Sequence, residues 1–178
     1  MNKDIGTIIL SEKQISEIID RIAGEIENDY KDNPPLFIGL LKGSFIFLAD
    51  LVRKIKMPAE VDFLVASSYG NRTVTSGSVK LGERSYENFI GKDVIIVEDI
   101  LDSGKTLSAV RERLYSEGVK SIKICTLLDK PYRRMADIKA DYLGIEIPDL
   151  FVVGYGMDYA EKYRNLPYVG ELKAEIYS

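Results

Sequence analysis

Apolar runs alternate with amphipathic stretches along most of the chain. Buried strands are predicted where apolar residues follow one another with little polar alternation. These runs lie at residues 36–41, 61–67, 94–97 and 122–128. Helices are predicted over residues 11–30 and over the stretches that follow Ser44 and Lys105, where apolar residues recur every three or four positions. Because parallel strands need crossover helices, this alternation predicts an α/β fold with a central parallel sheet of about five strands flanked by helices.

The length of 178 residues is typical of a single domain. We expect one domain over residues 1–178, with a core at about residues 30–145. The N-terminal residues and about residues 146–178 would form a small hood over the carboxyl edge of the sheet. Residues 68–78 are polar and lack periodicity, which is typical of a lid loop and also of an exposed hairpin tip.

The charge balance argues against two kinds of partner. There are 24 basic and 28 acidic residues, which give a net charge of −4. We therefore expect no general affinity for nucleic acid or for an anionic membrane. The sequence has neither a secretory signal nor an apolar run long enough to span a bilayer, so we expect a cytoplasmic protein.

Histidine is absent, and Cys125 is the only cysteine. No intrachain disulfide can form, and Cys125 lies in an apolar run that predicts a core thiol. The commonest general base and the commonest zinc ligand are missing, which argues against a structural zinc site. Catalysis must then use carboxylates, Lys, Arg, Tyr or a hard metal ion such as Mg²⁺.

The densest group of reactive side chains follows the apolar run at residues 94–97. Glu98 and Asp99 stand where this strand is expected to end, and residues 102–104 form a short loop before a helix. Ligands of open α/β sheets bind beyond the carboxyl ends of the strands, and a helix N-terminus there offers N–H groups to an anion. Carboxylates beside such donors suit a molecule with a phosphate, a diol and a magnesium ion.

Other interpretations of these segments are weaker. Residues 104–106 match the end of a P-loop, but that motif requires glycine where Asp99 stands. A buried strand with an ordinary acidic loop does not account for so many polar side chains within residues 98–106. Lys42 and Gly43 follow another predicted strand and precede a helix, which makes a second anion site or an ordinary turn with a solvated lysine.

Residues 94–107 closely resemble the phosphoribosyl-diphosphate (PRPP) binding motif of the type I phosphoribosyltransferases, in the form of the hypoxanthine-guanine branch. The resemblance continues in order along nearly the whole chain. It includes residues 41–44, 68–69, 128–130, 146–155, 157–159 and 163–168. It implies the type I phosphoribosyltransferase fold with a flexible flap loop, and a role in purine salvage. The implied reaction joins hypoxanthine or guanine to PRPP and gives a purine nucleotide (IMP or GMP) and diphosphate.

The resemblance implies that the loop after the central strand holds the 5′-phosphate. Backbone donors and two hydroxyls would bind it, contributed by Asp102, Ser103, Gly104, Lys105 and Thr106.

The resemblance also implies a magnesium enzyme. Glu98 and Asp99 would hold the ribose hydroxyls, directly or through Mg²⁺ and its waters. Asp158 matches a residue near a second Mg²⁺ and the edge of the base.

Further matches concern the leaving group. Lys42, Gly43 and Arg164 would bind the diphosphate, and the peptide bond before Lys42 is often cis in the family. The loop with Ser68 and Tyr69 would close over the substrate and exclude water.

The last matches concern the base. Asp102 matches the residue taken as the proton acceptor for purine N7, although capping the helix at residue 105 is a simpler role for it. Lys130 would donate to purine O6, Phe151 would stack on the base, and the Val152 backbone would meet its edge. A cationic donor disfavours a 6-amino group, so adenine is not expected.

Some alternatives stay open within the resemblance. The preference between hypoxanthine and guanine is undecided, and a xanthine-preferring enzyme is the nearest rival. A nucleotide-sensing regulator on the same fold is another, which the acidic net charge disfavours. The resemblance also implies a homodimer or homotetramer, for which the first helix and a tyrosine-rich tail would supply apolar surface. The tail tyrosines are Tyr155, Tyr159, Tyr163 and Tyr168.

Overall fold

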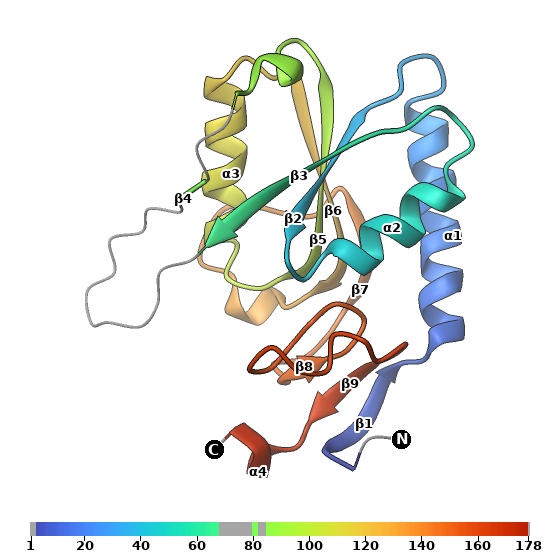
Figure 1. Ribbon diagram of the computed structural model, residues 1–178, viewed down its shortest axis with the longest axis vertical. Helices are drawn as coiled ribbons and strands as arrows, with labels where there is room; N and C mark the ends of the chain where they lie inside the picture. The colour runs from blue at the N-terminus through green and yellow to red at the C-terminus, as the bar shows by residue number, and fades with distance from the viewer. Residues whose placement is uncertain (1–2, 68–79, 82–84, 178) are drawn as a thin grey trace.

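The computed structural model describes residues 3–67, 80–81 and 85–177 (Figure 1). Within these residues, six strands form a large sheet in the order β4-β3-β2-β5-β6-β7. Their bounds are β2 Leu36–Leu41, β3 Glu60–Ser67, β4 Lys80–Leu81, β5 Asp93–Leu101, β6 Ser121–Asp129 and β7 Tyr142–Glu146. Strands β3, β2, β5, β6 and β7 are parallel, and β4 pairs antiparallel with β3 at one edge. The predicted parallel sheet is therefore confirmed.

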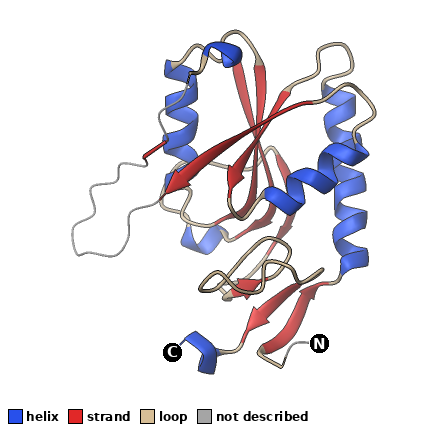
Figure 2. Ribbon diagram, in the orientation of Figure 1, coloured by secondary structure: helices blue, strands red, loops and turns tan. Residues whose placement is uncertain are grey.

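Helices cover both faces of the large sheet (Figure 2). Helices α1 (Glu12–Asp29) and α2 (Phe45–Lys54) pack on one face, and α3 (Lys105–Ser116) packs on the other. Alternate residues of β2 point to the two layers, so Phe37 packs with α1 and α2 whereas Ile38 packs with α3. Because both faces are buried, the central strands carry apolar residues at successive positions.

The first helix begins as its sequence predicts. Ser11 is the N-cap of α1, and its hydroxyl accepts a bond from the Gln14 N–H at 3.4 Å. The Gln14 side chain accepts a bond from the Ser11 N–H at 2.9 Å, which completes the capping box. Among the described helices, none is both long enough and apolar enough to cross a membrane.

The two ends of the chain form a second, small sheet. Strands β1 (Ile5–Leu10), β9 (Val169–Leu172) and β8 (Val152–Val153) pair antiparallel in that order. A short helix, α4 (Ala174–Tyr177), follows β9. The small sheet lies on the side toward which the parallel strands point (Figure 1), so it faces the edge where a ligand is expected. Two short 3₁₀ turns complete the described elements, at η1 Glu87–Phe89 and η2 Pro131–Arg133.

Two sequence-based expectations about the core have different outcomes. Cys125 is a free, fully buried thiol in β6, as predicted. The first helix and the tyrosine-rich tail do not supply exposed apolar surface, because the apolar face of α1 lies in the core and Tyr155 is 5% exposed. The other tail tyrosines pack around the core of the small sheet. Exposed apolar side chains lie on other elements, among them Phe45 on α2 and Val61, Phe63 and Val65 on β3.

Candidate active site

The two carboxylates of the central motif lie inside β5 rather than after it. The sequence predicts the end of the strand at these residues, but the ladder with β6 continues to Leu101, and Glu98 pairs with Thr126. The strand is longer because β6 supplies backbone partners beyond the apolar run. Glu98 is half-buried and Asp99 is 9% exposed. Both side chains line one cavity of about 220 Å³.

Burial makes this pair of carboxylates difficult to ionise. It raises the pKa of Glu98 well above its usual range, and the adjacent Asp99 charge raises it further. Burial also raises the pKa of Asp99, although hydrogen bonds to its carboxylate, including one from the Ile100 N–H at 2.8 Å, oppose the shift. A cation held between the two groups would relieve their repulsion.

The loop after β5 brings backbone donors to the same cavity. Gly104 is the N-cap of α3 with a φ of +78°, and a Cβ there would lie 2.5 Å from Ile138 Cγ2. Glycine is the residue that fits this turn. Ser103, Gly104 and Thr106 line the cavity, whereas the Lys105 side chain is exposed. The N-terminus of a helix at this place favours an anion.

A second loop closes the other side of the cavity. The Leu41–Lys42 peptide bond is cis, and Gly43 passes so close to the Asp99 carboxylate that a Cβ would clash with it. Gly156 lies after β8 with a φ of +100°, and a Cβ on it would clash with the Gly43 carbonyl oxygen. These two glycines let the loop, the central motif and the segment after β8 meet.

The two cations expected to bind diphosphate share one carboxylate. Glu161 Oε1 lies 3.1 Å from Lys42 Nζ, and Glu161 Oε2 lies 3.5 Å from Arg164 Nη2. Arg164 is also held by Asp158 Oδ1 at 2.8 Å and by the carbonyl oxygen of Gly156 at 2.8 Å. The Arg164 Nε atom is buried and has no hydrogen-bond partner among the described residues, so it remains a donor for an anion.

A second cavity, of about 250 Å³, adjoins the first. Its lining combines carboxylates, a lysine and apolar side chains, namely Asp99, Ile100, Asp102, Lys130, Phe151, Val152, Met157 and Asp158. Asp99 and Asp102 line both cavities. The structure thus brings the residues that the sequence assigns to the base close to those that it assigns to the ribose phosphate.

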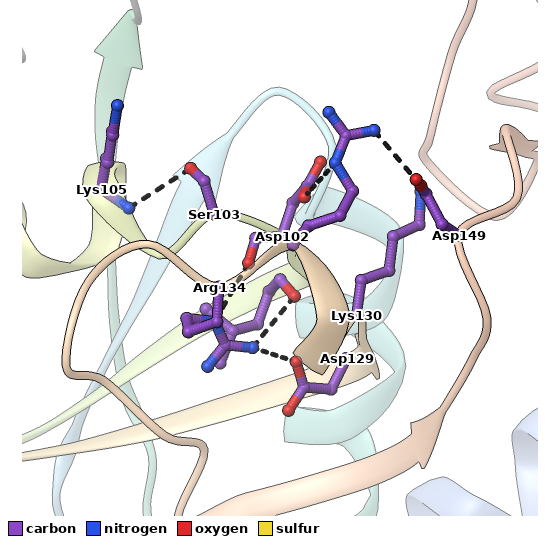
Figure 3. Close-up of polar contacts among 9 residues, drawn as sticks. Asp102, Ser103, Lys105, Asp129, Lys130, Arg134 and Asp149 are labelled. Atoms are coloured by element: carbon purple, nitrogen blue, oxygen red, sulfur yellow. Dashed lines mark hydrogen bonds and ion pairs between the residues drawn. The ribbon is translucent and has the colours of Figure 1, made fainter.

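Lys130 is the buried cation of the second cavity and is 6% exposed. Figure 3 shows its side chain beside Asp149. The backbone N–H of Lys130 donates to the Leu101 carbonyl at 2.9 Å, which fixes the end of β6 against the end of β5. Its Nζ lies 4.0 Å from Asp149 Oδ1. Burial lowers the pKa of Lys130, and the nearby charges of Asp102 and Asp149 oppose that shift.

Asp102 does not cap the helix that follows it. The N-cap of α3 is Gly104, and no side chain makes a cap hydrogen bond there. Asp102 Oδ1 lies 3.0 Å from Arg133 Nε, but it accepts no hydrogen bond from the described residues. The carboxylate therefore has a free acceptor site at the junction of the two cavities.

Four charged residues around Lys130 had no role assigned from the sequence, and two of them, Arg133 and Arg134, lie outside the stretches that resemble the family. Arg134 pairs with the carboxylate of Asp129 and donates from Nε to the Asp102 carbonyl at 3.0 Å (Figure 3). Arg133 joins Asp102 to Asp149, whose Oδ1 lies 3.3 Å from Arg133 Nη1. The signal for the two arginines was the run of a proline, a tyrosine and two arginines directly after Lys130. These residues orient the Asp102 loop from the base side.

The protein offers few ligands for a metal on its own. Among the described residues, no three or more His, Cys, Asp or Glu side chains form a group that could hold a metal ion. Glu98 and Asp99 provide adjacent hard oxygen atoms, which suit Mg²⁺ if a substrate supplies the remaining ligands. Asp158 is occupied by Arg164 instead. Ser68 and Tyr69, the predicted flap residues, lie outside the described part of the chain.

Comparisons with known proteins agree with this geometry. Residues 6–160 match the model of the phosphoribosyl transferase domain. The chain is 51% identical over 177 residues to hypoxanthine-guanine phosphoribosyltransferase of Bacillus subtilis, which covers 99% of this chain and 98% of that protein. A crystal structure of hypoxanthine phosphoribosyltransferase from Staphylococcus aureus is similar with a TM-score of 0.94 at 46% identity, covering 100% of this chain and 97% of that one. The chain belongs to the phosphoribosyltransferase family.

Proposed function

We propose that the protein transfers the 5-phosphoribosyl group of PRPP to hypoxanthine and guanine, giving IMP or GMP and diphosphate. One observation carries the proposal: two cavities with different chemistry meet at Asp99 and Asp102. The first has the donors and carboxylates for a ribose phosphate. The second has a buried lysine and an aromatic ring for a planar base with a carbonyl group. The relatives named for this reaction support the proposal.

The ribose phosphate would lie in the first cavity. The N-terminus of α3, with Ser103 and Thr106, would bind the 5′-phosphate. Glu98 and Asp99 would hold the two ribose hydroxyls. The C1′ atom would then point toward Asp102, where the two cavities join.

Lys42, Gly43 and Arg164 would receive the diphosphate. Positive charge develops at C1′ as the diphosphate leaves, so cations placed on the leaving group lower the barrier. The diphosphate would replace the Glu161 carboxylate between Lys42 and Arg164 and accept a bond from Arg164 Nε. Ser68 and Tyr69 would help to exclude the water that would otherwise attack the same carbon.

The base would occupy the second cavity. Lys130 would donate to the 6-oxo group, Phe151 would stack on the ring, and the Val152 backbone would meet the base edge. The Asp102 carboxylate would accept the N7 proton, since its Oδ1 atom accepts no hydrogen bond from the described residues. Lys130 fits hypoxanthine, guanine and xanthine better than adenine, because an ammonium cannot accept a bond from an amino group.

Mg²⁺ fits the Glu98 and Asp99 pair because both carboxylates are hard oxygen ligands whose raised pKa values favour a bound cation. When bound, Mg²⁺ would neutralise charge on the diphosphate. Asp158 would approach a second ion only after it separates from Arg164.

Activity should vanish in EDTA and return with Mg²⁺. Protons compete with the metal for Glu98 and Asp99. Because the pKa values of these carboxylates are raised, magnesium-dependent PRPP binding should begin to weaken at a higher pH than it would with ordinary carboxylates as the pH is lowered.

The exposed apolar side chains on α2 and β3 favour a homodimer or homotetramer. Val61, Phe63 and Val65 alternate along β3, with exposed fractions of 41%, 43% and 56%, and Phe45 of α2 is 42% exposed. Such a surface is typical of a subunit interface. Light scattering should show a dimer or tetramer, and Val65→Lys should reduce its size. A wild-type monomer at micromolar concentration would contradict this assignment.

Steady-state kinetics with PRPP and four purines test the proposed reaction. Hypoxanthine and guanine should be used, xanthine should be poorer, and adenine should be inactive. A preference for xanthine would move the assignment to that enzyme. Binding of nucleotides without turnover of any purine would identify a regulator on the same fold.

A further inference from the structure

The aromatic ring of Phe151 is covered on one face by the end of the chain. Its ring stacks on that of Tyr177 in α4, with 4.7 Å between the centroids and 22° between the planes. Tyr159 meets Phe151 edge-on, at 5.6 Å and 88°. A stacked pair covers one face of each ring, whereas a T-shaped pair sets the edge of one ring against the face of the other.

Phe151 also forms part of the wall of the second cavity. Phe151 lines that cavity together with Lys130 and Val152, whereas neither Tyr177 nor Tyr159 lines it. The Phe151 ring therefore contacts Tyr177 and also lines the space proposed for the base. A planar ligand stacked on Phe151 would complete a layered arrangement of base, Phe151 and Tyr177.

The position of Tyr177 is fixed by the small sheet. Ile176, the residue before it, packs on the small-sheet core of Ile5, Val153 and Leu172. The Leu172 N–H donates to the Phe151 carbonyl at 2.8 Å, so the chain leading into α4 is tied to Phe151 itself. Phe151 is 38% exposed. The stack with Tyr177 and the T-shaped contact with Tyr159 hold the plane of this ring.

We propose that Tyr177 is a positioning residue for the purine base, acting through Phe151 and without touching the substrate. The proposal rests on the proposed function, because it assumes that a base stacks on Phe151. Loss of the Tyr177 ring would remove one of the two aromatic contacts that hold the plane of Phe151, so base affinity would fall. The ribose phosphate site is built from β5 and α3 and would be unaffected.

The test is a comparison of Michaelis constants in three variants. Tyr177→Leu should raise the KM for hypoxanthine by about twofold to tenfold, the range expected for one aromatic pair, and leave the KM for PRPP unchanged. Tyr177→Phe keeps the ring and should restore the wild-type KM. Tyr115→Leu is the matched control, because Tyr115 is a similarly exposed tyrosine (49%, against 40% for Tyr177) at the end of α3.

Each result decides the question. KM does not depend on the fraction of folded enzyme, so partial unfolding of Tyr177→Leu would lower only the apparent kcat. Equal increases in both KM values, or an unchanged KM for hypoxanthine, would overturn the positioning role while the proposed function stands. A wild-type protein inactive with every purine would instead overturn the proposed function, and the role of Tyr177 with it.

Discussion

The ribose phosphate side and the base side of the site are built in different ways, although they share Asp99 and Asp102. Most of the first cavity is lined by one continuous segment, residues 98–107, at the end of β5 and the start of α3. The second cavity gathers side chains from β5, from the end of β6 and from the segment around β8. The first site is local in sequence, whereas the second exists only when distant segments have packed together.

Residues with positive φ also differ between the ribose phosphate side and the base side. Gly104 supplies the positive φ that the phosphate loop requires. On the base side, four residues other than glycine adopt positive φ, within the described part of the chain, and all lie after β8. They are Tyr155, Ala160, Glu161 and Tyr163. Such conformations persist only where surrounding contacts impose them, so this segment depends on its docking to the large sheet.

The largest effect should come from Asp102, where the two sides meet. Asp102→Asn keeps the shape and removes the proton acceptor, so kcat should fall by a factor on the order of 10²–10⁴. Because Asp102 caps no helix, thermal stability should change little. PRPP binding should stay close to wild type. Steady-state kinetics and a melting curve check both statements.

Asp149→Asn is the matched control for this substitution. Asp149 pairs with the same Arg133 but does not line either cavity. It should therefore lower kcat far less than Asp102→Asn. If Asp102→Asn turned over at the wild-type rate, solvent would accept the proton from N7, and Asp102 would have only a structural role between the two cavities.

A smaller effect, confined to the base side, should come from Lys130. Lys130→Met keeps the apolar stem and removes the charged donor, whose hydrogen bond to O6 is worth roughly 1.5–3 kcal/mol. The KM for hypoxanthine should rise about 10- to 100-fold, and PRPP binding should change much less. A fall in PRPP affinity alone would show that Lys130 serves the other cavity.

The pH dependence of hypoxanthine binding gives a second test of Lys130. Burial lowers the pKa of this lysine, so its charged fraction falls at a lower pH than that of an exposed lysine. As the pH is raised, the KM for hypoxanthine should therefore begin to increase at a lower pH than it would if Lys130 had the pKa of an exposed lysine. Lys130→Met should not show that rise.

The sequence predicted features that depend on neighbouring residues better than features that depend on contacts between distant segments. The apolar runs located the parallel strands, and Ser11 with Gln14 located the start of α1. The predicted end of β5 was wrong because hydrogen bonding to β6 continues the strand past Glu98 and Asp99. Pairing of β1 with β9 joins the two ends of the chain, and no local pattern encodes it. Arg133 and Arg134 were missed for the same reason, since their partners lie on other segments.

The junction between the two sides should be sensitive to a single methyl group. Gly156→Ala forces a non-glycine residue to a φ of +100° and places its Cβ against the Gly43 carbonyl. We expect a loss of at least about 1–2 kcal/mol in the free energy of unfolding, which lowers Tm by roughly 2–8 °C. Gly24→Ala is the control, because nothing lies within 4 Å of its added Cβ in the middle of α1. It should stabilise the protein by about 0.5–1 kcal/mol. Equal melting temperatures for the two variants would show that the close approach at Gly156 is unimportant.

The smallest effect should come from Glu161, which joins the two sides through charge. Its carboxylate pairs with Lys42 from the loop after β2 and with Arg164 from the segment after β8. A diphosphate would compete with Glu161 for both cations. Glu161→Gln removes the competitor, so diphosphate should bind about two- to fivefold more tightly, a small change because the Lys42 and Glu161 side chains are exposed. Isothermal titration with magnesium diphosphate measures the change.

Ionic strength separates competition by Glu161 from a general change in surface charge. Screening weakens exposed ion pairs, so the advantage of Glu161→Gln over wild type should shrink at about 1 M salt. Glu17→Gln removes the same charge from the exposed face of α1, where Glu17 pairs with Lys13 at 3.7 Å, and it should leave diphosphate affinity unchanged. Equal gains in Glu161→Gln and Glu17→Gln would mean that net charge alone sets the affinity. Weaker binding in Glu161→Gln would mean that Glu161 holds Lys42 and Arg164 in place for the ligand. Glu161 would then help diphosphate to bind rather than compete with it.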